Sequence, residues 1–147
     1  MFKRILVPVD GSETSTKALV AALQLARERD ASVRVIHVLD ELAYLTGYEY
    51  SATALEEARK YAQKTLDDAV AIAQSSGVPA DGKLLETPGR RLGDVVADEV
   101  RALNADLVVV GTHGRRGMSR VLLGSGAEQV IRVCPVPVLT IRAAEPA

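Results

Sequence analysis

The sequence predicts a doubly wound α/β protein in which helices cover both faces of one five-stranded parallel sheet. Short apolar runs rich in β-branched residues alternate with longer segments whose apolar residues recur at helical spacing. This alternation indicates right-handed crossovers and a mostly parallel sheet. The chain has 147 residues, of which 48% are hydrophobic and 25% are charged. We therefore expect one domain over residues 1–142, followed by a frayed tail over residues 143–147.

The beginning of the chain predicts a strand, a turn and a helix. Residues 5–9 form a short apolar run that Asp10-Gly11-Ser12 ends. Apolar residues then recur at helical spacing from Leu19 to Ala26. Residues 33–39 are rich in β-branched side chains and predict the second strand, which contains His37 as an ordinary core histidine.

The middle of the chain predicts a loop, a long helix and a short strand. Residues 40–50 show no period, and we expect a mobile loop there. Residues 55–73 carry apolar side chains at helical spacing, and Gly77 and Pro79 end this helix. Residues 83–86 predict the third strand.

In the last third of the chain, predicted helices and strands alternate in the same way. Residues 92–100 predict a helix, residues 107–110 a wholly apolar strand, and residues 127–134 a final helix. Residues 136–141 predict the fifth strand. Cys134, which has no second cysteine to pair with, is expected to be a buried structural thiol.

The polarity of the strands predicts their order. Strands buried on both faces are continuously apolar, so residues 5–9 and 107–110 should be central. The third strand is short and charged and the fifth contains Pro137, which places both at edges and gives the order 3-2-1-4-5. The direction of winding then reverses between strands one and four, where open α/β sheets bind ligands. We expect the site where Asp10 and Gly111 meet.

Charge and hydropathy exclude several classes of function. The formal net charge is −1, so nothing in the overall balance attracts nucleic acid or an anionic membrane. No segment approaches the roughly 20 apolar residues of a membrane span. We expect a cytoplasmic protein.

A glycine-rich stretch follows the fourth strand. Gly111 and Gly114 lie three positions apart, and Gly124-Ser125-Gly126 follows after nine further residues and opens the last helix. Glycines let backbone N–H groups face a shared anion, and a helix N-terminus attracts phosphate. Ser125 is expected to be the N-cap, with Glu128 as its capping-box partner.

Two other phosphate motifs are excluded. Residues 77–83 imitate part of a P-loop, but Leu84 stands where Ser or Thr is required. The turn after the first strand has only Gly11, without the further glycines of a dinucleotide-binding turn.

The spacing Gly-x-x-Gly, nine residues, Gly-Ser resembles the signature of ATP-binding universal stress proteins. The resemblance extends to the opening Ile-Leu-Val-Pro-Val-Asp-Gly-Ser, to His37-Val38, and to Pro135-Val-Pro-Val-Leu near the end. It implies an adenine pocket edged by Pro8, Asp10 and the backbone of Val38, with phosphates and ribose on the glycine turns. The implied ATP-binding residues are Pro8, Val9, Asp10, Val38, Val110, Gly111, His113, Gly114, Arg115, Gly124, Ser125 and Gly126.

Some of these residues have a second interpretation. Asp10 could be a turn former or helix cap, and His113 could point to solvent instead of donating to a phosphate. Arg115 belongs to a basic cluster that includes Arg116 and Arg120, and Arg90 and Arg91 begin a neighbouring helix. These cations are either phosphate contacts or solvated surface. Whether Mg²⁺ accompanies the phosphates is open.

The chain shows no recognisable catalytic carboxylate pair, metal-ligand spacing or nucleophile elbow. The prediction is a stress-response or regulatory protein that binds ATP and hydrolyses it slowly or not at all. The alternatives are a nucleotide-using enzyme on the same fold and a dimeric interaction module that does not bind ATP. Residues 136–141 form an apolar sheet edge, which predicts a homodimer through the fifth strand.

Overall fold

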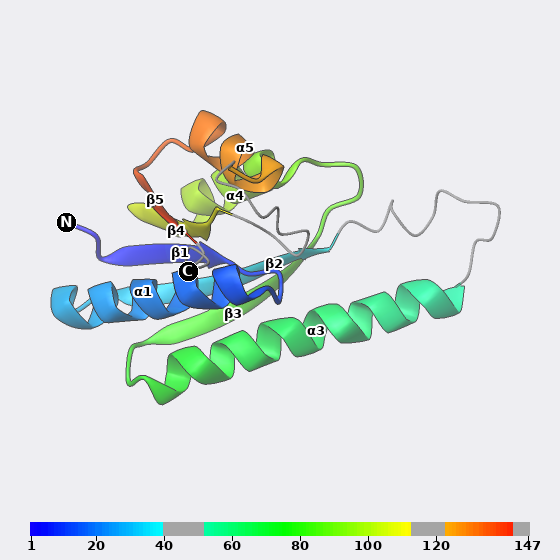
Figure 1. The fold of residues 1–147 in the computed structure, drawn as a ribbon, viewed down its shortest axis with the longest axis horizontal. Coiled ribbons are helices and arrows are strands. Elements are labelled where there is room, and N and C mark those ends of the chain that lie inside the picture. The colour runs from blue at the N-terminus through cyan, green and yellow to red at the C-terminus, as the bar shows by residue number, and fades with distance from the viewer. Residues whose placement is uncertain (40–51, 113–122, 143–147) are drawn as a thin grey trace, which may run out of the picture.

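The computed structural model describes residues 1–39, 52–112 and 123–142, and arranges them as a parallel sheet between two layers of helices (Figure 1). The strands are β1 (Arg4–Pro8), β2 (Ser32–Leu39), β3 (Ala80–Glu86), β4 (Leu107–Gly111) and β5 (Val138–Ile141). The helices are α1 (Glu13–Arg29), α3 (Ala52–Ser75), α4 (Leu92–Leu103) and α5 (Ser125–Val133). None of these helices is long and apolar enough to cross a membrane.

The five strands lie in the order β3-β2-β1-β4-β5, which confirms the predicted fold class and strand order. β1 pairs in parallel with β2, Val7 lying opposite Val35, and with β4, Ile5 lying opposite Leu107. Ile5 and Val7 have no exposed surface. The continuous burial of β1 is the reason that its sequence is apolar on both faces.

Successive residues of the central strands supply two separate cores. Ile5 and Val7 point to the face that α1 and α3 cover, and there they pack with residues such as Leu19 and Leu66. Leu6 points to the opposite face, beneath α4 and α5, and belongs to the cluster of Val100. A strand alternates its side chains between the two faces of a sheet, so one apolar run fills both cores. Figure 1 shows the two helix pairs on opposite sides of the sheet.

The two edge strands differ from their predicted bounds. β3 begins at Ala80, three residues before the predicted start at Lys83, and pairs with β2 along its whole length. β5 begins at Val138, so Pro137 precedes the strand and does not belong to it. The carbonyl of Pro137 still accepts a hydrogen bond from Val108 N at 3.0 Å, but proline has no N–H to extend the ladder.

A buried carboxylate connects α4 to β2 and β3. Glu99 is only 5% exposed, and its Oε1 accepts a hydrogen bond from Arg34 Nη1 at 3.2 Å. Lys83 Nζ lies 3.3 Å from both carboxylate oxygens. Arg34 also donates two hydrogen bonds to Asp81, at 2.9 and 3.0 Å, and these lower the pKa of the Asp81 carboxyl. These ion pairs explain why the first half of β3 can contain Asp81 and Lys83 and still pair with β2.

Three further predictions concern single segments. The predicted loop over residues 40–50 and the tail over residues 143–147 lie outside the described residues. Cys134 is half-buried against the α4–α5 core, so it is less enclosed than expected. Gly77 has φ +81° just after α3, which confirms its role in ending that helix.

Candidate functional site

The carboxyl end of β1 leads into a tight turn before α1. Val9 N donates to Ile36 O at 2.8 Å, and His37 Nδ1 lies 2.7 Å from Val9 O. These contacts hold the end of β1 against the end of β2, and they give His37 the ordinary hydrogen-bonded role that was expected of it. Gly11, with φ +84°, then reverses the chain in a conformation that favours glycine.

Asp10 stabilises this turn. Its Oδ1 accepts a hydrogen bond from Ser12 N at 2.9 Å, which confirms the turn-forming interpretation. Ser12 is the N-cap of α1, and its Oγ accepts from Ser15 N at 3.1 Å. The N-terminus of α1 is therefore already capped by its own side chain.

The end of β4 lies against the first turn of α1. A Cβ added to Gly111 would lie 2.8 Å from Thr14 Cγ2 and 3.0 Å from the Thr14 carbonyl carbon, so only glycine fits this approach. Thr112 N donates to Ile141 O at 2.9 Å, and Thr112 O accepts from Gly124 N at 2.5 Å. These bonds place the start of α5 directly beside the end of β4.

The start of α5 differs from the prediction at one residue. Gly124, not Ser125, is the N-cap, and no side chain in the described part of the chain caps the helix. Ser125 is already the first helical residue because the hydrogen bond to Thr112 fixes Gly124 in an extended conformation, with φ −62° and ψ 154°. The expected capping box is absent, and Glu128 instead pairs with Arg132 at 2.8 Å. The N–H groups of the first turn therefore have no acceptor within the helix.

Gly126 has a packing role that the glycine signature did not reveal. A Cβ there would lie 2.8 Å from Leu92 Cδ2, at the contact between α5 and α4. Gly93 makes a similar close approach, since its added Cβ would lie 2.7 Å from Gln129. Gly111 is thus required by packing against the Thr14 backbone, whereas a side chain at Gly126 would have to displace the end of the Leu92 side chain.

The structure brings most of the predicted residues to one edge of the sheet. Pro8, Val9 and Val110 are buried, and Asp10 and Val38 are half-buried. The Gly124-Ser125-Gly126 turn is partly open to solvent. The predicted residues His113, Gly114 and Arg115 lie outside the described residues, as do Arg116 and Arg120.

The two arginines before α4 differ in their surroundings. Arg90 Nη1 forms an ion pair with Asp98 at 2.6 Å, so its charge is matched on the protein surface. Arg91 is the exposed N-cap of α4 and borders a hollow of about 330 Å³ that Ser125 and Arg132 also line. This hollow adjoins the start of α5, since Ser125 lines it.

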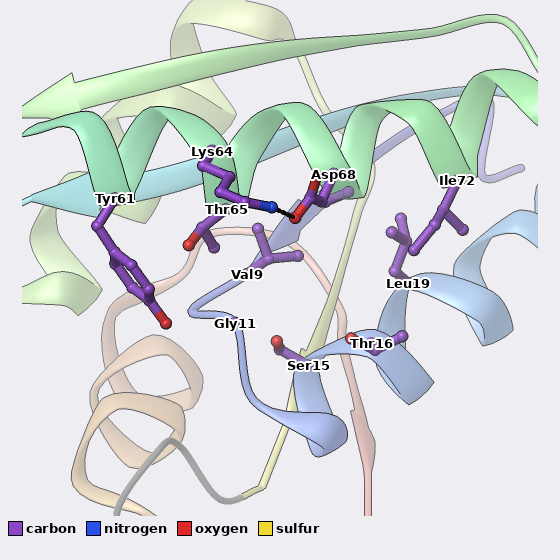
Figure 2. A pocket seen from close by; sticks show the side chains of 11 residues that line it. Val9, Gly11, Ser15, Thr16, Leu19, Tyr61, Lys64, Thr65, Asp68 and Ile72 are labelled. Atoms are coloured by element: carbon purple, nitrogen blue, oxygen red, sulfur yellow. Dashed lines mark hydrogen bonds and ion pairs between the residues drawn. The ribbon is translucent and has the colours of Figure 1, made fainter.

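A second hollow lies beside the β1–α1 turn (Figure 2). We call it the α1–α3 groove. It has a volume of about 250 Å³ and lies between the β1–α1 turn, the first half of α1 and the middle of α3. Sequence reasoning did not find it, because its walls come from segments about 50 positions apart, Val9–Leu19 and Tyr61–Ile72. Over the described ranges of the chain, no group of three or more His, Cys, Asp or Glu side chains could hold a metal ion.

A family model described as the Universal stress protein family matches residues 1–142. A Staphylococcus aureus strain USA300 protein that carries the universal stress protein name is 31% identical over 146 residues, which cover 98% of this chain and 86% of that protein.

Solved structures agree with this match. A protein from the universal stress protein family of Burkholderia pseudomallei is 32% identical, with a TM-score of 0.78 over 97% of each chain. The universal stress protein from Archaeoglobus fulgidus in complex with dAMP is 27% identical, with a TM-score of 0.71 over 96% of this chain and 98% of that one.

Proposed function

Since this chain belongs to the universal stress protein family, we propose that it binds ATP at the carboxyl edge of its sheet and acts as a stress-response or regulatory module. The Archaeoglobus fulgidus relative in complex with dAMP supports a nucleotide as the class of ligand. The edge where β1, β2 and β4 end is also the point at which the winding of the sheet reverses.

One observation carries this proposal. Among the described residues no side chain caps the N-terminus of α5, whereas the N-terminus of α1, on the neighbouring strand, is closed by Ser12. A helix start with free N–H groups and a positive dipole end attracts an anion. Of the two helices that begin beside the ends of β1 and β4, α5 is therefore the one that accepts phosphate.

The residues at the edge fit the rest of a nucleotide. Pro8 and Val110 are the apolar residues near the ends of β1 and β4, where the base would lie, and the half-buried Asp10 carboxylate offers an acceptor for an amino or hydroxyl group. The backbone of Val38, at the end of β2, completes the proposed adenine pocket. His113, Gly114 and Arg115 stay in the proposal as phosphate contacts.

We propose binding with slow or no hydrolysis, so that bound nucleotide acts through stability or choice of partner. The binding experiment is run with and without Mg²⁺, because the phosphates would supply part of the coordination that this ion needs.

A Ser125→Pro substitution tests the phosphate site. Proline is well tolerated at the first helical position, and the extended Gly124 before it suits a following proline. The substitution removes the Ser125 N–H, which would cost about 1.5–3 kcal/mol if that group donates to a phosphate. ATP affinity measured by calorimetric titration should fall roughly tenfold to a hundredfold.

Ser125→Ala is the matched control, because it removes the hydroxyl and keeps the N–H. Its ATP affinity should stay near that of the wild type. Equal affinity in the proline variant and the alanine variant contradicts the phosphate site, and no binding of ATP to the wild type at millimolar concentration contradicts the proposed function.

The protein is further proposed to be a homodimer joined through β5. Among the described strands β5 pairs only with β4, so it forms a sheet edge. Leu139 on this strand is 41% exposed, and Ile131 and Val133 on the adjacent α5 are 45% and 38% exposed. An apolar edge favours pairing with another chain. The opposite edge, β3, carries ion-paired Asp81 and Lys83 instead.

A further inference from the structure

The turn that carries Asp10 lies against α3 as well as against α1. Figure 2 shows the side chains of Tyr61 and Thr65 pointing from α3 towards Gly11, at one end of the α1–α3 groove. A Cβ on Gly11 would lie 3.5 Å from both Tyr61 Oη and Thr65 Cγ2, and 3.7 Å from Thr65 Oγ1. These are van der Waals distances, so the two α3 side chains cover the side of Gly11 to which a side chain would point.

The position of α3 is fixed by its packing on the sheet. Leu66 is 4% exposed and belongs to the core beneath α1 and α3. A side chain on Gly82 of β3 would overlap Val70 of α3, so the helix approaches this edge strand closely. Tyr61 and Thr65 are four positions apart and therefore lie on one face of the helix. The packed helix thus holds both side chains at a fixed place above the turn.

The turn itself has a flexible point at Gly11. Asp10 N donates to Ser15 Oγ at 3.3 Å, and Asp10 Oδ1 accepts from Ser12 N at 2.9 Å. Both bonds stay within the turn and the start of α1, so they fix the shape of the turn more than its position. Glycine has access to many backbone conformations, and Gly11, with φ +84°, lies between the residues that these bonds join. A contact from a neighbouring element therefore restrains the turn.

We propose that Tyr61, assisted by Thr65, is a positioning residue of the nucleotide site. By covering Gly11, the two side chains keep the β1–α1 turn in the arrangement in which the Asp10 carboxylate meets the ligand. Tyr61 acts through the turn and not through a contact with the nucleotide. This proposal rests on the proposed function, because it takes Asp10 as a contact of ATP.

The size of the effect follows from the population of the competent turn. The apparent affinity falls in proportion to the fraction of molecules whose turn has the binding arrangement. If removal of the Tyr61 side chain lowers that fraction to about 10–30%, the ATP affinity falls about three- to tenfold. The fold should keep most of its stability, because Tyr61 is 47% exposed.

The first test is made without nucleotide. Exchange of the Ser12 amide proton with water reports on the turn, because this N–H donates to Asp10 Oδ1. We expect Tyr61→Ala to accelerate this exchange, measured by NMR, by about threefold or more. An unchanged exchange rate at Ser12 would overturn the proposal.

The second test is calorimetric titration with ATP. Tyr61→Ala should lower the affinity about three- to tenfold. Ile72→Ala is the matched control, because Ile72 is 39% exposed and lies on the same helix at the opposite end of the groove (Figure 2). Its affinity and its Ser12 exchange should match the wild type. An equal loss of affinity in Ile72→Ala would mean that any loosening of α3 has this effect, and the proposal would be wrong.

A double-mutant cycle with Asp10 distinguishes positioning from a direct contact. If Tyr61 acts by placing the Asp10 carboxylate, Tyr61→Ala should lower the ATP affinity of the wild type and leave that of Asp10→Ala unchanged. The same loss in both backgrounds would show that Tyr61 acts independently of Asp10, which contradicts the proposal. A merely structural role of Tyr61 would also give the same loss in both.

Two substitutions at Thr65 test the covering contact by itself. Thr65→Val keeps the shape of the side chain and should keep the ATP affinity, whereas Thr65→Ala removes the atoms that lie nearest Gly11 and should lower it about two- to threefold. Equal affinities in the two variants contradict a contact that acts by covering the turn. Circular dichroism confirms that each variant is folded, and the Thr65 pair decides the question should Tyr61→Ala fail to fold.

Failure of this proposal differs from failure of the proposed function. If the wild type binds ATP and Tyr61→Ala binds it equally well, only the positioning role is wrong. If the wild type binds no ATP, the proposed function fails, and the role of Tyr61 in a nucleotide site fails with it. The Ser12 exchange rate then still shows whether Tyr61 holds the turn.

Discussion

Replacing Asp10 separates its role in the turn from its role in the proposed nucleotide site. In the structure the carboxylate accepts one hydrogen bond, from Ser12 N at 2.9 Å, and the residue is half-buried. Losing one such bond costs about 1 kcal/mol of folding free energy. For a chain of this size, Asp10→Ala should therefore lower the melting temperature by about 2–4 °C.

Asp10→Asn is the informative control for stability. Its amide oxygen still accepts from Ser12 N, so its melting temperature should remain close to that of the wild type. If the carboxylate also binds ATP, Asp10→Ala should lose about 1–3 kcal/mol of binding free energy, which is roughly five- to 150-fold in affinity. Asp10→Asn should lose less, because its oxygen still accepts a hydrogen bond.

The assays are thermal denaturation followed by circular dichroism, and calorimetric titration with ATP well below the melting temperature. If Asp10→Ala melts lower but binds ATP as the wild type does, Asp10 is only a turn former and the adenine pocket is wrongly assigned. If its melting temperature is unchanged, the argument from the turn is refuted.

The remaining predictions concern the charge network and the sheet edge. Arg34→Met should lower the free energy of unfolding, measured in urea, by about 3 kcal/mol, because it leaves the buried Glu99 carboxylate with Lys83 as its one remaining cation. Glu99→Leu should lower it less, because it removes the buried carboxylate itself. The lowered pKa of Asp81 stabilises the fold above about pH 4, and this stability is lost as the pH falls through the lowered value. In acid titrations followed by circular dichroism, Asp81→Asn should therefore lose less stability than the wild type. Leu139→Asp should give a monomer by light scattering; a wild-type monomer at micromolar concentration would exclude the dimer.

The central part of the fold follows from the sequence. Ile5, Val7 and Val109 belong to runs that are apolar on both faces, and the structure buries all three completely. Only a strand covered by helices on both sides needs such a run, so the composition alone predicts the position in the sheet. Gly77, likewise, was predicted to end α3 from its residue type and place.

The edge strands were predicted less well. Asp81 and Gly82 do not resemble a strand, and the pairing of Asp81 with Arg34 becomes visible only when β2 and β3 lie side by side. Val136 and Pro137 resemble a strand, but the ladder begins only at Val138. An edge strand is stabilised by its neighbour more than by its own residues, so its bounds depend on tertiary contacts.

The sequence by itself determined the strand order, the family resemblance and the sheet edge at which Asp10 and Gly111 meet. Only the tertiary structure decided why certain residues stand there. Gly111 is glycine because the backbone of α1 passes within contact of it. The cap at Gly124 was set by its bond to Thr112, and the α1–α3 groove arose from two segments distant in the chain. Periodicity reports which face of an element is buried, but a close approach between two elements is a property of their packing and leaves no local pattern.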